Sequence, residues 1–328
     1  MTETRISIAM ASYNGARYLS EQLESLAAQR RLPDELVVCD DASEDDTLEV
    51  LESFAAGAPF AVRIERNEQT LRTAQNFAKA VSLCSGELIF LADQDDAWRP
   101  DKLQVMESYF DAHPQVGALF CNGQVCDGEL RPLGYDLWQA QWFHPSEQRR
   151  VREGRPLEVF VRHSVAAGNT LAFRSRFREL VLPITGLEDG ADTWIAFLIA
   201  AVSEFHILDR DLVQYRLHGA NQIGLRRFDL RQQLERARWQ LQQGIFDYGV
   251  RFFSGVEDRL SSQPEPEWQP APETLELVRE KIAHCRRRDR MSPQFLTRLP
   301  DVARETLNRG YWRFSYGLKS LLQDLLLR

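Results

Sequence analysis

The sequence lacks the features of a secreted, membrane-spanning or nucleic-acid-binding protein. Its 328 residues include only five scattered cysteines, which favours a reducing compartment over a disulfide framework. No hydrophobic run is long enough to cross a bilayer, and the first residues contain no secretory signal. The formal net charge of −8 argues against nucleic acid as a partner. We therefore expect a cytoplasmic protein.

The sequence also lacks both common glycine-rich phosphate loops. No Gly-x-Gly-x-x-Gly follows the first predicted strand, and no Walker A sequence occurs in the chain. If a nucleotide binds here, another group must neutralise its phosphates, and a divalent cation held by a carboxylate is one such group.

The most informative stretch is a short apolar run that is followed by acids. Residues 88–92 predict a buried strand of a parallel sheet. Asp93, Asp95 and Asp96 follow where this strand ends, and Pro100 suits the start of the next helix. Ligands of open α/β sheets bind at the carboxyl ends of the strands, where clustered acids repel one another unless a cation lies among them. The alternative is a solvated acidic loop that caps the helix.

Strands and helices alternate in the first part of the chain, which predicts a mostly parallel sheet with flanking helices. Strands are expected at residues 6–11, 35–39, 61–65, 88–92 and 116–121, and later at 205–208 and 212–217 after a buried helix at 189–202. Helices are expected at 230–248, 275–290 and 314–327. We therefore expect an α/β domain over residues 1–225 and a helical region over residues 226–328.

The last predicted helix is rich in leucine and lies in a basic segment. Residues 279–328 contain 12 Lys/Arg and 5 Asp/Glu, so they carry +7 and the rest of the chain carries −15. We expect this helix to present one leucine-rich side, made of Leu318, Leu321, Leu322, Leu325 and Leu326. Two interpretations stay open. The helix packs against the rest of the chain or a second subunit, or it attaches to the inner face of an anionic membrane.

Four motifs, taken together, resemble family 2 of the glycosyltransferases, whose fold is GT-A. They are residues 11–15 (ASYNG), 37–43 (VVCDDAS), 91–98 (LADQDDAW) and 215–224 (YRLHGANQIG). The Asp-Gln-Asp-Asp-x-Trp form, with Lys102 and Leu103 after it, is similar to the bacterial rhamnosyltransferase-like branch. The resemblance covers residues 5–225 closely and implies a Rossmann-like GT-A catalytic domain followed by a helical region.

The resemblance implies a role for the residues that match the family motifs. The nucleotide sugar would contact Ser12, Tyr13, Asn14, Asp40, Asp41, Arg72, Asp93 and Gln94. Asp95, assisted by His218, would hold a Mg²⁺ or Mn²⁺ ion that bridges the donor diphosphate. Asp192 would be the general base, although Ala191 stands where the family often has a polar residue. The acceptor-side candidates are Trp142, Asn169 and Trp194.

The implied reaction is an inverting hexosyl transfer. The donor that the resemblance favours is dTDP-L-rhamnose, and the alternative is another dTDP- or UDP-sugar. The implied acceptor is a hydroxyl of a cell-surface polysaccharide or lipid-linked glycan. Such transfer needs a base on the acceptor hydroxyl and charge relief on the leaving diphosphate.

Other functions remain open from the residues alone. The alternative from another class is a catalytically silent protein of the same fold that binds sugar nucleotides or glycans. Asp192 is also compatible with a plain acid at a helix start, and His218 with a turn histidine. A nucleotidyltransferase would need a basic, glycine-rich loop that residues 9–15 do not supply.

Overall fold

The computed structural model describes residues 4–185, 187, 189–219, 221 and 228–327, and the chain forms two compact units. Unit 1 contains residues 1–154 and 165–226, and unit 2 contains residues 155–164 and 227–328. The short segment 155–164 therefore belongs with the C-terminal helices rather than with the α/β domain, a grouping that sequence periodicity does not reveal.

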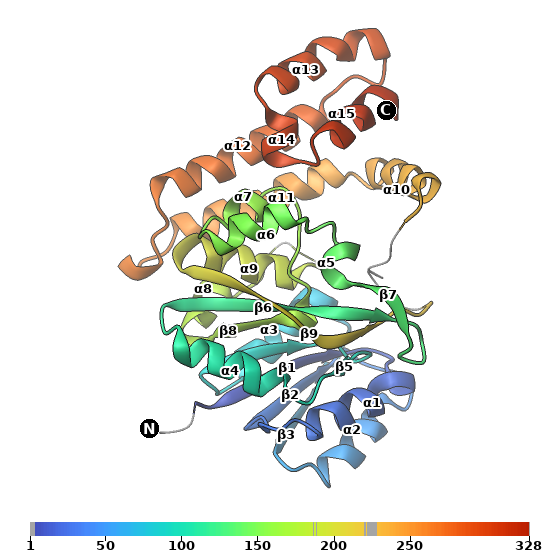
Figure 1. Cartoon of the computed structure of the whole chain (residues 1–328), viewed down its shortest axis with the longest axis vertical. Helices are drawn as coiled ribbons and strands as arrows, with labels where there is room; N and C mark the ends of the chain where they lie inside the picture. The colour runs from blue at the N-terminus through green and yellow to red at the C-terminus, as the bar shows by residue number, and fades with distance from the viewer. Residues whose placement is uncertain (1–3, 186, 188, 220, 222–227, 328) are drawn as a thin grey trace. The chain divides into compact units, whose positions relative to one another are not determined.

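Unit 1 is built on a nine-stranded, mixed sheet (Figure 1). Its strands are β1 Ile6–Ser12, β2 Glu35–Asp40, β3 Ala61–Arg66, β4 Leu88–Ala92, β5 Ala97–Trp98, β6 Val116–Cys126, β7 Pro132–Asp136, β8 Leu171–Arg174 and β9 Glu204–Arg216. The order is β3-β2-β1-β4-β8-β6-β9-β5, with β7 paired to β6. β1 to β4 are parallel to one another, whereas β8 runs antiparallel to β4 and β6. The predicted α/β fold is confirmed.

Helices cover both faces of this sheet. They are α1 Ala16–Ala27, α2 Thr47–Ala55, α3 Thr73–Leu83, α4 Lys102–Ala112, α5 Leu137–Ala140, α6 Pro145–Arg152, α8 Arg178–Val181 and α9 Ala191–Val202. Helices α1, α2 and α4 pack on the face that carries Ile6, Ile8 and Met10. Helix α3 lies against β1 and β2 and contacts α9. As its all-round apolar sequence predicted, α9 is buried along most of its length.

One prediction about the sheet is wrong, because the strands expected at 205–208 and 212–217 are a single strand, β9. The register shifts between these halves: Leu208 pairs with Cys121, and Asp211 pairs with Asn122. The residues between the two predicted strands form an irregularity within one long strand.

Unit 2 consists of helices, and glycines interrupt two that the sequence predicted to be continuous. The helices are α7 Leu157–Phe160, α10 Leu230–Gln242, α11 Ile245–Ser261, α12 Pro272–Asp289, α13 Phe295–Leu307, α14 Gly310–Phe314 and α15 Leu318–Leu326. Gly244, with φ 69°, separates α10 from α11, and Gly317, with φ 58°, precedes α15. Both have a positive φ that favours glycine, and each turns the chain into the helix that follows it, α11 and α15. No helix in the described part of the chain is long and apolar enough to cross a membrane.

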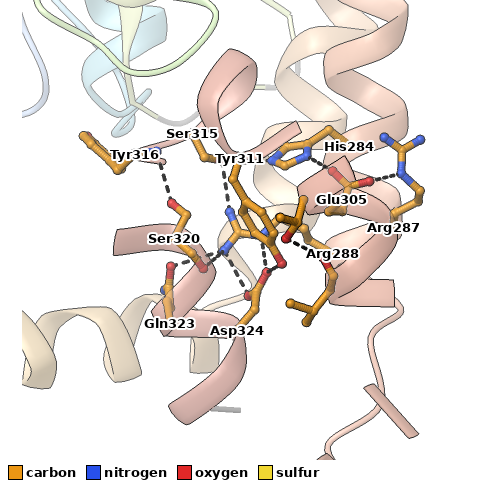
Figure 2. Close-up of polar contacts among 12 residues, drawn as sticks. His284, Arg287, Arg288, Glu305, Tyr311, Ser315, Tyr316, Ser320, Gln323 and Asp324 are labelled. Atoms are coloured by element: carbon orange, nitrogen blue, oxygen red, sulfur yellow. Dashed lines mark hydrogen bonds and ion pairs between the residues drawn. The ribbon is translucent and has the colours of Figure 1, made fainter. Parts of the chain in front are cut away.

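A buried polar network joins four helices of unit 2 (Figure 2). Arg288 of α12 donates from Nε to Asp324 Oδ2 at 2.7 Å and from Nη2 to Asp324 Oδ1 at 3.0 Å. The Tyr311 hydroxyl of α14 donates to Asp324 Oδ2 at 2.9 Å. All three side chains are almost fully buried. Removing one partner would leave a buried charge unpaired, so this network holds α15 in one rotation about its axis.

A neighbouring histidine makes the stability of the protein sensitive to acid. His284 Nδ1 lies 2.5 Å from Glu305 Oε2, and its Nε2 lies 2.9 Å from Ser315 Oγ. Burial lowers the pKa of His284 to about 4, helped by the charges of Lys281 and Arg288 and opposed by the hydrogen bond with Glu305. The folded protein therefore binds fewer protons here than the unfolded chain, whose histidines titrate near pH ~6.5.

We expect the free energy of unfolding to fall by about 3 kcal/mol through His284 as the pH drops from ~6.5 to ~4. The contribution is fully present above the unfolded pKa and is lost on acidification through this window. Urea unfolding of the wild type and His284→Gln across this range measures it. Equal pH dependence of the two proteins would contradict the prediction.

Candidate active site

The carboxyl ends of β1, β2 and β4 border a cavity of about 1250 Å³ in unit 1. Ser12 pairs with Asp40 across β1 and β2, and Met10 pairs with Ala92 across β1 and β4, so three strand ends lie side by side. Ten of the predicted site residues line the cavity: Ser12, Tyr13, Asn14, Asp41, Arg72, Asp93, Gln94, Asp95, Asp192 and His218. The cavity thus brings together residues from the whole length of unit 1.

Asp41 positions the loop that carries Arg72. Its carboxylate accepts hydrogen bonds from Asn67 Nδ2 at 2.8 Å, Leu71 N at 2.6 Å and Arg72 N at 2.9 Å. Arg72 has a φ of 69°, which a non-glycine residue adopts only when its surroundings hold it there. The predicted nucleotide ligand Asp41 therefore also fixes Arg72 at the cavity wall.

Gln94 joins the acidic loop to the loop after β1. Its side chain accepts from Tyr13 N at 2.9 Å and donates to Tyr13 O at 3.0 Å. A Cβ atom on Gly15 would lie 2.1 Å from Gln94 Oε1, so a larger residue at position 15 would displace Gln94. Asn14 donates its backbone N–H to Ser43 Oγ at 2.9 Å. These contacts keep the two loops together beside the exposed Tyr13 ring.

Acidic side chains crowd the end of β4. Burial raises the pKa of Asp93 well above its usual value, and the charges of Asp96, Asp95 and Asp192 raise it further. Burial, followed by the charge of Asp95, raises the pKa of Asp96 to about 7. This mutual repulsion is the electrostatic condition that a bound cation relieves.

Asp95 and His218, the two candidate cation ligands, lie side by side. His218 Nε2 lies 2.8 Å from Asp95 Oδ2, and Asn221 Nδ2 donates to the same oxygen at 3.2 Å. Among the residues with described positions, no three His, Cys, Asp or Glu side chains converge as a complete ligand set. Mg²⁺ commonly binds through one or two carboxylates plus water and substrate phosphates. The residues present therefore fit a cation that a nucleotide diphosphate completes.

Asp96 follows Asp95 in the sequence and is held by hydrogen bonds of its own. Its carboxylate accepts from Arg216 N at 2.9 Å and also from Asn169 Nδ2. The Arg216 side chain, 1% exposed, donates from Nε to Asp95 O at 2.7 Å. Sequence reasoning assigned Arg216 no role, although its place two residues before His218 in the late motif was an available clue. The rest of that motif, positions 220 and 222–224, lies outside the described residues.

Lys102, which follows the Asp-Gln-Asp-Asp-x-Trp motif, is a second buried cation close to these acids. It is fully buried, and its Nζ lies 3.3 Å from the centre of the Trp98 ring and donates to Asn169 O. Its charge lowers the pKa of both Asp93 and Asp96. Lys102 therefore offsets part of the negative charge at the end of β4.

Asp192 faces the cavity from the first turn of α9. Its Oδ1 accepts from Thr193 N at 2.6 Å. Burial raises the pKa of Asp192, whereas hydrogen bonds from Thr193 and Gly168 lower it. Because a carboxylate with a raised pKa is the stronger base, this environment suits proton abstraction. Helix α9 begins after Gly190, whose φ of 82° turns the chain into the helix.

Asp40 lies outside the cavity lining. It is fully buried, and its carboxylate accepts from Ser12 Oγ at 3.0 Å and Ser43 N at 2.9 Å. Successive side chains at a strand end point to opposite sides, so only one of the two adjacent acids, Asp41, reaches the cavity. Asp40 is thus hydrogen-bonded internally, and its contact with a nucleotide stays a prediction.

The three acceptor-side candidates also lie outside this cavity. Trp194 is fully buried because its helix is apolar on all sides. Its indole N–H donates to Val181 O at 2.9 Å. Asn169 is buried against Asp96. Trp142 lines a separate cavity of about 330 Å³. None of the three acceptor-side candidates therefore lines the main cavity, and their role in acceptor binding stays a prediction.

Comparison with known proteins decides the family. Residues 7–177, more than half of the chain, match the model of "Glycosyl transferase family 2". The chain belongs to glycosyl transferase family 2. The family resemblance read from the motifs is thereby confirmed, and sugar transfer is the activity of the family to which this glycosyltransferase belongs.

Relatives of this glycosyltransferase align over only part of their length. It is 28% identical to an uncharacterized glycosyltransferase of Nostoc sp. over 66% of this chain and 66% of the relative. The abequosyltransferase RfbV of Salmonella typhimurium is 30% identical over 52% of this chain and 51% of its own. The dTDP-rhamnosyl transferase RfbG of Shigella flexneri is 34% identical over 29% and 34% respectively. The chain thus matches less than two thirds of the length of these relatives.

Two solved structures share the fold of this glycosyltransferase. S. aureus TarS, residues 1–349 in complex with UDP-GlcNAc, matches with a TM-score of 0.58 and 15% identity over 86% of this chain and 72% of that chain. The mannosyltransferase PcManGT from Pyrobaculum calidifontis, in complex with GDP-Man and Mn²⁺, matches with a TM-score of 0.52 and 19% identity over 94% and 76%. These similarities confirm the GT-A-like α/β fold.

Proposed function

We propose that this glycosyltransferase is an inverting, metal-dependent enzyme that transfers L-rhamnose from dTDP-L-rhamnose to a hydroxyl of a cell-surface polysaccharide or lipid-linked glycan. The observation that carries the proposal is a single cavity lined both by Asp192 and by the acids Asp93 and Asp95. Asp192 would supply a base for the acceptor hydroxyl, and Asp93 and Asp95 would supply a place for a cation that binds the donor.

The two halves of the cavity divide the chemistry between them. The acceptor oxygen forms a bond to the anomeric carbon as the bond from that carbon to the diphosphate breaks, and the diphosphate keeps the electron pair. Asp192 takes the proton of the acceptor hydroxyl. A divalent ion on Asp95 and His218 would supply charge neutralisation to the leaving diphosphate. Attack from the face opposite the diphosphate inverts the anomeric configuration, and no covalent nucleophile is required.

The choice of donor rests on the Asp-Gln-Asp-Asp-x-Trp motif at residues 93–98 and on the partial similarity to the dTDP-rhamnosyl transferase of Shigella flexneri. The structural neighbours carry different donors, UDP-GlcNAc and GDP-Man, so the fold itself accepts several nucleotides. The base of the nucleotide would lie against the Tyr13 side of the cavity, where Asp41 and Arg72 are held.

We expect dTDP-L-rhamnose with Mn²⁺ to raise the midpoint of thermal unfolding more than UDP-GlcNAc, GDP-mannose or dTDP alone. A ligand that binds only the folded protein stabilises it by mass action, and about 2.7 kcal/mol is gained at a hundredfold excess over its Kd. The same series without Mn²⁺ and with EDTA is the control. A larger shift with another nucleotide sugar would contradict the assignment of dTDP-L-rhamnose as the donor. A shift that is the same with and without Mn²⁺ would contradict the requirement for a cation.

The anomeric configuration of the product, read by NMR, tests inversion separately. Binding of the donor without turnover on any glycan acceptor would instead favour a silent sugar-nucleotide-binding protein.

A further inference from the structure

Helix α13 of unit 2 buries charged side chains and exposes leucines, which is the reverse of an ordinary surface helix. Its buried positions include Arg298, 2% exposed, and Glu305, 0% exposed. Its exposed positions include Leu296, Leu299 and Leu307, at 77%, 37% and 83%. A surface helix of a soluble protein normally turns its apolar side inward.

Helix α15 repeats this reversal. Ser320 and Asp324 are buried, whereas Leu318, Leu322 and Leu326 are 60%, 44% and 69% exposed. The sequence predicted five leucines on one side of this helix. Instead they divide: Leu321 and Leu325 pack against the small core of Met291, Val302 and Tyr311, and the other three face outward.

The two helices are neighbours. The core that receives Leu321 and Leu325 of α15 includes Val302 of α13. Arg298 of α13 also donates from Nη2 to Leu325 O of α15 at 3.2 Å. The exposed leucines of both helices therefore belong to one small helical layer. We call these six residues the leucine surface: Leu296, Leu299, Leu307, Leu318, Leu322 and Leu326.

The polar network fixes this inverted arrangement (Figure 2). Turning α15 so that Leu322 faced inward would remove Asp324 from Arg288 and Tyr311, which it contacts at 2.7 and 2.9 Å. Turning α13 would likewise separate Glu305 from His284. Each rotation leaves a charge buried without its partner, which is strongly destabilising. The outward leucines are thus a built feature of the fold.

The exposed charges of the segment that carries the leucine surface are positive, and one of them, Arg313, is ion-paired with Glu280 of α12. Within residues 292–327, the exposed charged side chains are Arg304, Arg309, Arg313 and Lys319. Of the three acids in the same segment, Glu305 and Asp324 are buried, and Asp301 is half-buried. Trp312 and Tyr316, 46% and 44% exposed, lie in the same segment. Aromatic rings of this amphipathic kind are enriched at the boundary between lipid and water.

We propose that the leucine surface docks on an anionic lipid bilayer, with the leucines at the acyl boundary and the cations among the headgroups. Apolar residues flanked by Lys and Arg are the pattern of helices that lie in a membrane interface. A second copy of the chain fits less well, because a two-fold contact through this surface would bring its own cations together. The docking does not depend on which sugar is transferred.

The test uses the full-length protein and sedimentation with lipid vesicles. We expect binding to phosphatidylcholine vesicles that contain about a third phosphatidylglycerol, and about tenfold weaker binding to pure phosphatidylcholine. Binding should fall as the salt concentration rises from ~0.1 M to ~1 M, which shortens the Debye length from about 10 to about 3 Å. Leu318→Ser with Leu326→Ser should weaken binding on the order of a hundredfold.

A matched pair of substitutions controls for loss of surface leucine in general. Leu133 and Leu234 are 44% and 43% exposed and lie outside the leucine surface, so Leu133→Ser with Leu234→Ser should bind vesicles like the wild type. Arg304→Glu, at an exposed position, should weaken binding only to the anionic vesicles. The thermal midpoint of each variant, and its shift with donor, should stay unchanged, which separates this test from that of the sugar donor.

Three results would overturn the proposal. They are no binding of the wild type to anionic vesicles, equal binding to vesicles with and without phosphatidylglycerol, and equal loss in the two leucine pairs. A dimer in sedimentation velocity that only Leu318→Ser with Leu326→Ser dissociates would assign the surface to contact between copies instead.

Discussion

Replacing Asp192 with asparagine should lower the turnover number of sugar transfer by about a thousandfold while leaving metal-dependent donor binding unchanged. Asparagine keeps the size of the side chain but cannot take a proton from the acceptor hydroxyl. The environment of Asp192 suits that proton transfer, because burial raises its pKa although hydrogen bonds from Thr193, Gly168 and its own backbone oppose the shift.

The control for this variant is an acid that also lies in the first turn of a helix but does not face the cavity. Glu49 is an exposed acid in the first turn of α2, so Glu49→Gln tests the contribution of a helix-terminal charge alone. We expect near-wild-type turnover from Glu49→Gln. Similar turnover for Asp192→Asn and the wild type, with unfolding of Asp192→Asn shifted to lower temperature, would reduce Asp192 to a structural helix acid.

The pH profile gives an independent measurement of the same assignment. A base with a raised pKa loses activity on acidification at a pH above the usual Asp value of about 3.9, because protonation removes the lone pair that accepts the proton. The wild type should therefore show an acidic limb in kcat that lies above this value. The residual turnover of Asp192→Asn should lack that limb.

Local sequence patterns predicted the strand ends well because buried parallel strands are uninterrupted apolar runs. The run at 88–92 coincides with β4, and two of the three acids after it, Asp93 and Asp95, line the cavity, whereas Asp96 is fully buried. The patterns failed where backbone geometry, not hydrophobicity, sets the boundary. Gly244 ends a helix through its left-handed φ, although the helical pattern continues on both sides of it.

The side-chain roles were harder to predict because burial of a charge depends on partners distant in the chain. Arg216 is buried by its contacts with Asp95 and Asp96, about 120 positions earlier. The outward leucines of α15 follow from the pairing of Asp324 with Arg288, which lies in another helix. Amphipathic spacing alone predicted that all five leucines lie on one side of the helix, whereas only Leu321 and Leu325 pack inward.

Replacing Asp95 with asparagine should lower the Mn²⁺-dependent affinity for the nucleotide sugar and the turnover number, each by about a hundredfold to a thousandfold. Asp95 is the one acid of the cluster whose carboxylate lies beside His218, at 2.8 Å, and also lines the cavity. Without its charge, the ion would lose its main protein ligand. Titration of Mn²⁺ at fixed donor, followed by calorimetry, measures the effect.

The control is Asp111→Asn, an exposed acid on α4, which should bind metal and donor like the wild type. Donor binding in EDTA should also be the same for Asp95→Asn and the wild type, because the nucleoside contacts do not involve Asp95. Unchanged Mn²⁺ dependence in Asp95→Asn would contradict this assignment and transfer the role to Asp93.

Substitution of His218 tests whether His218 and Asp95 hold the same metal ion. If both side chains hold the same ion, His218→Gln should weaken Mn²⁺-dependent binding by itself, and the double variant should be little worse than Asp95→Asn. Interacting residues give such non-additive effects, whereas independent ones add within about 0.5 kcal/mol. Additive losses would mean that His218 acts by positioning another group. Because Asp192→Asn should leave this metal dependence intact, binding and turnover measurements together would assign the two acids to opposite halves of the reaction.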